Sequence, residues 1–178
     1  MKRNMTMRTI GADRTTKTEQ PDIRFRDVLA MEYTASLKKS DLVLSKGGHA
    51  CLPCRPEKVI DEWCLTHGSS MRGRIDSLKA LLGQVRKPPV LVSESEGVFF
   101  IPMRASVPGA DNLWINESQI LKISQPERGT TRILFLNGAL LEIPYDIRMV
   151  KRQREICERY RKLLYEYRTL DAPVPFGK

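Results

Sequence analysis

Long apolar runs are missing from this chain of 178 residues. The longest are Val98–Met103 and Ile133–Leu136, whereas a membrane-spanning helix needs about 20 apolar residues. The basic N-terminus is followed by no apolar stretch of the kind that a secretory signal contains. We therefore expect no membrane partner, a cytoplasmic location and four cysteines that stay reduced.

Histidine is also scarce, and two histidines leave few options for acid–base catalysis. No Ser/His/Asp set, phosphate-binding glycine loop or paired-carboxylate site is visible in the sequence. The pair Cys51 and Cys54 has the spacing of a thiol oxidoreductase, but such a pair normally opens a helix in a βαβ unit. Pro56 intervenes here and no parallel βαβ unit follows. The chain is therefore not expected to be an enzyme or to carry a cofactor.

The same cysteines raise the possibility of zinc, because Cys51, Cys54, Cys64 and His67 make a Cys₃His set. However, Cys64 falls on the apolar face of a predicted helix, and a buried thiol explains it more simply. We expect no metal, and a zinc-stabilised nucleic-acid-binding protein is the lesser alternative.

Positive charge is abundant, with a net charge of +9 and a pI near 9.6. Residues 1–26, 68–90 and 146–168 each carry a net +4, which leaves −3 on the rest of the chain. An excess concentrated in this way attracts a polyanion, and nucleic acid is the commonest one in a cytoplasm. A basic protein that is merely soluble is the alternative.

Apolar periodicity and turn residues divide the chain into short elements. Asn137-Gly138 indicates a hairpin with a type I′ turn, and Pro126 to Gly129 indicates a second turn. Ser70 is suited to cap the second helix, and Gly83 to end it. The expected strands are Val28–Thr34, Leu42–Leu44, Val90–Val92, Val98–Met103, Ile120–Ile123, Thr131–Leu136 and Ala139–Ile143, and the expected helices begin at Pro56, at about Arg72 and at residue 146.

These elements predict an α+β fold. It consists of an antiparallel β-meander, a short two-helix N-terminal section and a long C-terminal helix packed on the sheet. Residues 1–27 are expected to form a flexible basic arm, residues 28–168 the domain, and residues 169–178 a loose tail. The stripe of Tyr160, Leu163, Leu164 and Tyr167 on the last helix is expected to pack and to support dimerisation.

Three separated segments resemble the ComK family of competence transcription factors. Trp63 to Arg74 resembles the family's Cys-Arg-Phe-Phe-Gly-Ser-Ser-x-x-Gly-Arg segment. Lys87-Pro88-Pro89, Phe99 to Pro102 and Leu113 to Ile115 resemble its Lys-Pro-Pro, Phe-Pro and Trp-Ile elements in the same order. Phe135 to Pro144 is similar to its Phe-x-Asn-Gly and Leu-Pro hairpin. The shared order over residues 58–160 is more specific than any one segment.

The resemblance implies a transcription activator that binds AT-rich double-stranded DNA, largely through the minor groove, as a homo-oligomer (a dimer or higher). Two departures limit what it implies. The tail from Leu170 to Phe176 lacks the family's Phe-Met-Leu-Tyr-Pro-like segment, so control by an adaptor and a protease is in doubt. The basic arm and the Cys51/Cys54 pair have no family counterpart.

The leading DNA-binding candidates surround a helix-initiating turn, at Ser69, Ser70, Arg72 and Arg74, with Lys87 downstream. Free N–H groups at a helix start and arginine guanidinium groups both suit phosphate oxygens. A plain helix cap with solvated arginines is the alternative.

Lys122, Arg128 and Arg132 extend this footprint if they share a face of the hairpin, although an ordinary solvated hairpin carries such charges as well. The basic face of the last helix is expected to be laced by Glu155 and Glu158, and a recognition helix is the second interpretation. A protein-interaction module with an acidic partner is the rival function. An RNA-binding module would need exposed aromatic side chains, yet Phe99, Phe100 and Phe135 lie in core-like runs.

Overall fold

The computed structural model describes residues 8–10, 23–104 and 112–169, which form two antiparallel sheets and three α-helices. The larger sheet has the strand order β4-β3-β2-β7-β6-β5 and the smaller sheet β1-β10-β9-β8. The strands are β1 (Arg8–Ile10), β2 (Val28–Thr34), β3 (Lys39–Leu44), β4 (His49–Leu52), β5 (Val90–Ser93), β6 (Val98–Arg104), β7 (Asn112–Asn116), β8 (Ile120–Glu127), β9 (Thr130–Phe135) and β10 (Leu140–Ile143). The helices are α1 (Pro56–Thr66), α2 (Met71–Leu82) and α3 (Ile147–Thr169), with 3-10 turns at Phe25–Asp27, Ala35–Leu37 and Glu117–Gln119.

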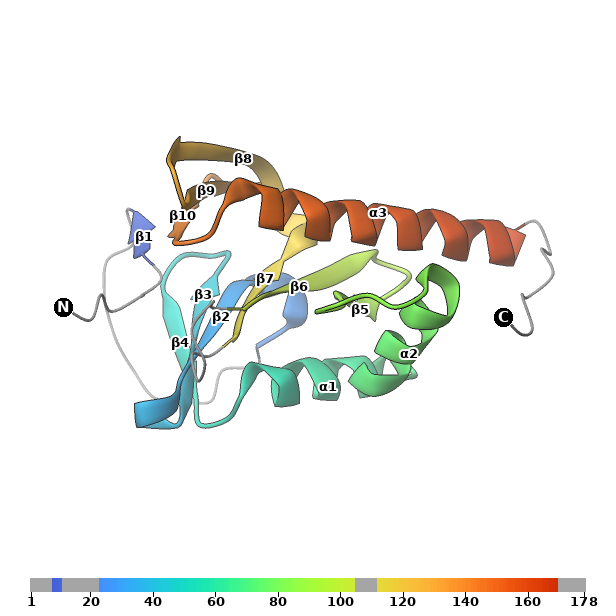
Figure 1. Ribbon diagram of the computed structural model, residues 1–178. Coiled ribbons are helices and arrows are strands. Elements are labelled where there is room, and N and C mark those ends of the chain that lie inside the picture. Colours follow the sequence, from blue (N-terminus) through green and yellow to red (C-terminus); the bar gives the residue numbers. More distant parts are fainter. Residues whose placement is uncertain (1–7, 11–22, 105–111, 170–178) are drawn as a thin grey trace.

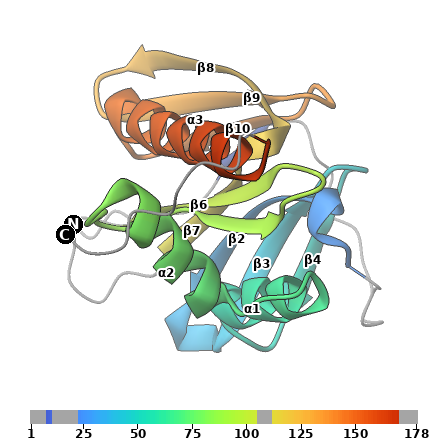
Figure 2. The same cartoon turned by 90° about the vertical axis from the view of Figure 1, so that its right-hand side faces the viewer.

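The elements stack in layers around the larger sheet (Figures 1 and 2). Helix α1 covers one face of this sheet, and α3 lies over the other face, with the smaller sheet beyond it. Helix α2 runs along the β5 edge and contributes side chains to the cores on both faces. Successive residues of a strand point to opposite faces, so Phe99 and Ile101 of β6 pack on the α3 side while Phe100 packs on the α1 side. Strands β5, β6 and β7 are therefore buried on both faces, which explains why β5 and β6 are nearly continuously apolar, whereas the edge strand β4 is largely exposed.

The long helix α3 buries one stripe, as its 3–4 periodicity predicts. Val150, Gln153, Cys157 and Tyr160 lie on this stripe. Tyr160 is only 2% exposed, donates a hydrogen bond to the Ser77 hydroxyl at 2.8 Å and meets the ring of Phe99 edge-on. The packing predicted for this stripe is therefore confirmed at Tyr160, and dimerisation through the stripe stays a prediction.

The short helices form where the sequence signals place them. Pro56 is in the first turn of α1, where its missing N–H costs nothing. The Ser70 side chain caps α2, and Gly83 follows the last residue of α2 with a φ of +79° that suits glycine. Both predicted helices are therefore confirmed.

The α+β class, the antiparallel strands and the packed C-terminal helix are confirmed, but the strands do not form one meander. Strand β2 pairs with β7, which brings Ala30 opposite Ile115 and places β2–β4 in the same sheet as β5–β7. The two short helices also follow three strands of that sheet instead of forming an N-terminal section. Strands β4 and β7 were not expected from the sequence, because β4 contains Cys51 of the Cys-x-x-Cys motif and β7 lacks clear turn signals.

The β9–β10 hairpin forms at Asn137-Gly138, but its turn is not of type I′. That turn needs a positive φ at both central residues, and only Gly138, at +84°, has one. The Phe135 N–H bonds to the Ala139 carbonyl and the Gly138 N–H to the Phe135 carbonyl. The loop is therefore the longer type, in which glycine takes the left-handed position.

Part of the predicted arm is packed. Phe25 is 6% exposed and lies in the core beneath α1, and the Asn116 side chain donates hydrogen bonds to the carbonyls of Phe25 and Val28 at 3.2 and 3.0 Å. Packing thus extends at least to residue 23, and not only to residue 28. Apart from β1, which pairs with β10, residues 1–22 lie outside the described residues, as do residues 170–178 of the tail. No described helix is long and apolar enough to cross a membrane.

Candidate nucleic-acid interface

The turn between α1 and α2 is built by its own hydrogen bonds. Ser70 Oγ accepts from the Gly73 N–H at 3.0 Å, and Asp61 Oδ1 accepts from the Met71 N–H at 2.7 Å. A Cβ atom at Gly73 would lie 2.6 Å from Ser69 Oγ, so the serine side chain would have to move to admit one. Two N–H groups that the sequence suggested for phosphate are therefore already bound within the chain, one of them by a carboxylate.

The two arginines of this turn differ in what they contact. Arg74 is half-buried, and its Nη2 donates to the His67 carbonyl at the end of α1, while its Nε is buried without a partner among the described residues. The Arg72 side chain is 90% exposed and lies 3.6 Å from the Asp76 carboxylate. It also lines a groove of about 700 Å³ shared with Glu57 and Asp61. A backbone carbonyl therefore lies beside the Arg74 guanidinium and carboxylates lie near that of Arg72, so neither group belongs to a purely basic surface.

Lys122 and Arg132 of the smaller sheet share a face, as the prediction required. Lys122 lies opposite Leu134, and Arg132 is two residues before Leu134 on β9. Arg132 is paired with Glu142 of β10 at 2.6 Å, so the positive charge of one of these two residues is neutralised. Arg128 is exposed in the β8–β9 turn. Hydrogen bonds from Arg148 lower the pKa of the Asp146 carboxyl at the start of α3, and the charge of Arg128 lowers it by a smaller amount.

The predicted DNA-binding residues do not form one surface. In both views the β8–β9 hairpin lies beyond α3, while the turn between α1 and α2 lies on the opposite side of the larger sheet (Figures 1 and 2). Residues 69–74 and residues 122–132 are thus separated by the body of the molecule.

Lys87 has a different setting, because the segment between α2 and β5 meets α3. Gln153 Nε2 donates a hydrogen bond to the Lys87 carbonyl oxygen at 3.0 Å, and Ser77 of α2 binds Tyr160 of α3. Two of the three segments with a net charge of +4, residues 68–90 and 146–168, are therefore brought side by side. The sequence located both segments but did not show that they meet.

Four exposed cations flank this junction, and we call them the helix–loop patch: Arg86, Lys87, Arg152 and Arg159. Arg152 and Arg159 are seven residues apart, two turns along one side of α3, and Arg152 is the neighbour of Gln153. None of the four forms an ion pair with a described residue. Arg86 was not singled out from the sequence, where its membership of the basic segment 68–90 was the available signal.

Other arginines of α3 are occupied by a buried carboxylate. Glu117, whose side chain is 8% exposed, lies 3.1 Å from Arg154 and 3.5 Å from Arg161. Arg161 also stands over the Phe99 ring at 5.0 Å. The pairs that were predicted for Glu155 and Glu158 are not formed among the described residues. Glu117 of the 3-10 turn after β7 pairs with Arg154 and Arg161, and Glu166 pairs with Lys162. This leaves the opposite side of α3, with Arg152 and Arg159, as its unpaired basic side.

The four residues considered for zinc are not brought together. Within the described part of the chain, no three potential ligands form a metal-binding group. Cys51 is exposed on the edge strand β4, whereas Cys64 is buried in α1, where burial raises its pKa to about 11. His67 directs Nδ1 toward the Trp63 carbonyl at 2.9 Å.

The family model described as ComK protein matches residues 28–169. The chain belongs to the ComK family. A competence transcription factor of Bacillus subtilis (strain 168) is 28% identical over 90 residues, which cover 51% of this chain and 46% of that relative. The alignment thus spans about half the length of the curated relative. No solved structure matches the chain.

The ComK match includes every element that builds the helix–loop patch and the β8–β9 hairpin. It also includes the three segments of resemblance, which the structure places at the junction of α1 and α2, in β5–β7 and in the β9–β10 hairpin.

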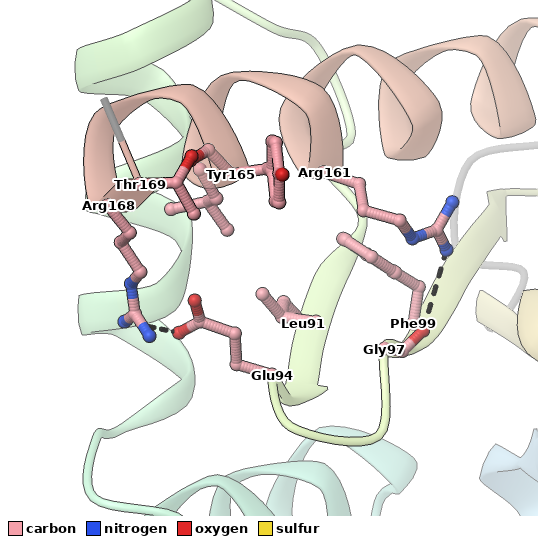
Figure 3. Close-up of a pocket in the computed structure, with 9 residues that line it drawn as sticks. Leu91, Glu94, Gly97, Phe99, Arg161, Tyr165, Arg168 and Thr169 are labelled. Carbon is pink, nitrogen blue, oxygen red and sulfur yellow. Dashed lines mark hydrogen bonds and ion pairs between the residues drawn. The ribbon is translucent and has the colours of Figure 1, made fainter. Parts of the chain in front are cut away.

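A separate pocket of this ComK-family chain lies beyond Arg161, between the end of α3 and the β5–β6 turn (Figure 3). It has a volume of about 240 Å³ and an apolar lining that includes Leu91, Phe99 and Leu164. Arg168 closes one side through an ion pair with Glu94 at 2.6 Å. This pocket lies on the Glu117 side of α3, away from the helix–loop patch.

Proposed function

We propose that this ComK-family chain is a competence transcription regulator that binds double-stranded DNA through the helix–loop patch. The observation that carries the proposal is the junction at Gln153 and Lys87, which joins two basic segments and leaves four cations unpaired. Unpaired lysine and arginine supply most of the affinity of a protein for duplex DNA, because each phosphate contact releases counterions.

The β8–β9 hairpin is proposed as a second contact. Arg128 lies in its turn near the start of α3, and Lys122 is exposed on β8 and forms no ion pair with the part of the chain that the structure describes. Arg132 is a weaker candidate because it is paired with Glu142. The residues Ser69, Ser70, Arg72 and Arg74 stay a prediction, which their internal hydrogen bonds and the nearby carboxylates make less favourable.

A preference for AT-rich sites, entry into the minor groove, a role as an activator and assembly as a homo-oligomer are proposed from the family resemblance. Arginine is suited to the first two, because AT-rich duplexes have a narrow minor groove with a strongly negative potential. The burial of Phe99, Phe100 and Phe135, each 0% exposed, favours a duplex over single-stranded RNA as the ligand.

The experiment is a titration of fluorescent AT-rich and GC-rich duplexes at several salt concentrations. We expect the logarithm of the affinity to fall linearly with the logarithm of the salt concentration. Changing Arg152 and Arg159 to alanine should lower this slope by about two, since each lost phosphate contact removes roughly 0.9. Arg24 and Arg55, exposed on the α1 side, give a control with the same two substitutions.

The result that contradicts the proposal is equal binding by the two double variants, or no binding to any duplex at low salt. If an acidic polypeptide such as poly-glutamate bound as tightly as the duplexes and competed with them, the rival protein-interaction module would be favoured. Equal affinity for AT-rich and GC-rich duplexes would leave DNA binding intact but contradict the sequence preference.

A further inference from the structure

Lys87 has an unusual backbone conformation. Its φ is +52°, and among the described non-glycine residues only Lys38 also has a positive φ. A side chain disfavours this left-handed region, and the proline that follows, Pro88, pushes the preceding residue toward extended conformations. The strain lies in an exposed loop whose neighbouring residue, Arg86, is also an exposed cation.

The conformation is held from α3. Gln153 is 8% exposed, and its Nε2 donates to the Lys87 carbonyl oxygen at 3.0 Å, while its Oε1 has no partner among the described residues. An apolar residue would fill the same position of the packing stripe without burying an unpaired amide oxygen. The glutamine is thus poorly explained by packing, and its one hydrogen bond fixes the loop.

Strained residues persist where the surrounding structure determines them, and they gather at functional sites. After Lys87 the chain enters the larger sheet. Pro89 and Val90 are buried, and Val90 is the first residue of β5. The Lys87 backbone is therefore fixed between α3 and the larger sheet.

We propose that Gln153 is a positioning residue of the helix–loop patch, and that the group it prepares the patch to bind is the phosphate backbone of a duplex. By holding Lys87 in the left-handed conformation, Gln153 sets the positions of Arg86 and Lys87 relative to Arg152 and Arg159. Cations that are fixed before binding lose less freedom when they contact regularly spaced phosphates. The inference rests on the proposed function, since it concerns the same surface.

The first test is a double-mutant cycle, measured by the binding of a fluorescent duplex of mixed sequence. Gln153→Met removes the N–H donor and keeps the length of the side chain. We expect it to weaken binding roughly tenfold and to lower the salt slope by about one to two. The same substitution at Gln84, an exposed residue of the same loop, is the matched control and should change affinity by less than about twofold.

The cycle is completed in a chain that carries Arg86→Ala and Lys87→Ala. If Gln153 acts through the loop cations, Gln153→Met should have almost no further effect on binding in this background. An equal loss in both backgrounds, or no loss in the chain with its natural loop, overturns the positioning role. In either case duplex binding by the unaltered chain preserves the proposed function, whereas its absence overturns both.

The second test measures the strain without DNA and does not change Gln153, so it applies even if Gln153→Met fails to fold. Lys87→Gly and Lys87→Ala both remove the cation, but only glycine adopts a positive φ freely. We expect Lys87→Gly to unfold at a higher temperature than Lys87→Ala. A glycine variant that is no more stable than the alanine variant overturns the proposal.

Discussion

The Arg74 guanidinium donates a hydrogen bond to the His67 carbonyl oxygen at 2.5 Å, so an arginine that the sequence suggested for DNA closes the end of a helix instead. The carbonyls in the last turn of a helix lack partners within that helix, and a cation there also interacts favourably with the helix dipole. Arg74 is the fourth residue of α2, and its hydrogen bond thereby links the first turn of α2 to the end of α1.

Arg74→Ala should consequently reduce stability more than DNA binding. The loss of a hydrogen bond from a charged, half-buried group predicts a decrease of about 1–2 kcal/mol in the free energy of unfolding. Arg72→Ala is the control, because its side chain is 90% exposed and its removal should change stability by less than about 0.5 kcal/mol. Urea unfolding measures both values. A stable Arg74→Ala variant that fails to bind duplexes would return Arg74 to the DNA-binding set.

Glu117 should be important for the docking of α3. Its carboxylate is nearly buried and forms ion pairs with both Arg154 and Arg161, whose side chains are 37% and 48% exposed. Because solvent screens the two guanidinium groups, we expect Glu117→Gln to cost about 1–2 kcal/mol, less than the removal of a partner from a fully buried pair. Glu158→Gln, on the exposed surface of the same helix, is the control, and thermal unfolding is the measurement. Equal midpoints for the two variants would contradict this role.

The four cysteines should differ in their reaction with a thiol reagent. Cys51 is exposed, whereas Cys64 and Cys157 are each 0% exposed, and burial raises the pKa of both buried thiols. Only the thiolate reacts, so we expect iodoacetamide at pH 8 to label Cys51 first and the buried pair only after unfolding. Mass spectrometry of peptides gives the order. Early labelling of Cys64 would show that α1 opens readily.

The sequence predicted the local structure of this chain better than its long-range pairing. Both short helices follow from signals within one or two turns, such as the Ser70 cap and Gly83. The union of β2 with β7 depends on the contact of Ala30 with Ile115, and nothing near either residue specifies its partner. The turn at Asn137-Gly138 shows the same limit on a small scale, because the residues fix a hairpin but not its loop length.

The candidate site was predictable in its charge but not in its geometry. The excess on residues 68–90 and 146–168 was visible, yet only the fold brings Lys87 beside Gln153. Periodicity also does not reveal which arginine has an internal partner. Arg74 and Arg152 have the same chemistry, and the difference between them is that a backbone carbonyl lies beside one and not the other.

The protein should lose stability at alkaline pH, because the pKa values of buried acidic side chains are raised in the folded state. Burial raises the pKa of Cys64 from 9.0 to about 11 and that of Tyr145 from 10.0 to about 12, with a smaller contribution from Glu32 to the latter. The folded state therefore holds these protons at a pH where the unfolded state has released them. Their contribution to stability is fully present below pH 9 and is lost as the pH rises through 11 to 12.

We expect the free energy of unfolding to fall by a few kcal/mol in total between about pH 9 and pH 12. Urea unfolding at a series of pH values measures this fall. Tyr145→Phe supplies the control, because it removes one titrating group and also a long hydrogen bond of 3.4 Å to the Met103 carbonyl, and it should make the decline less steep. A stability that is constant to pH 12 would mean that these side chains reach solvent, and it would contradict the burial of Tyr145 and Cys64.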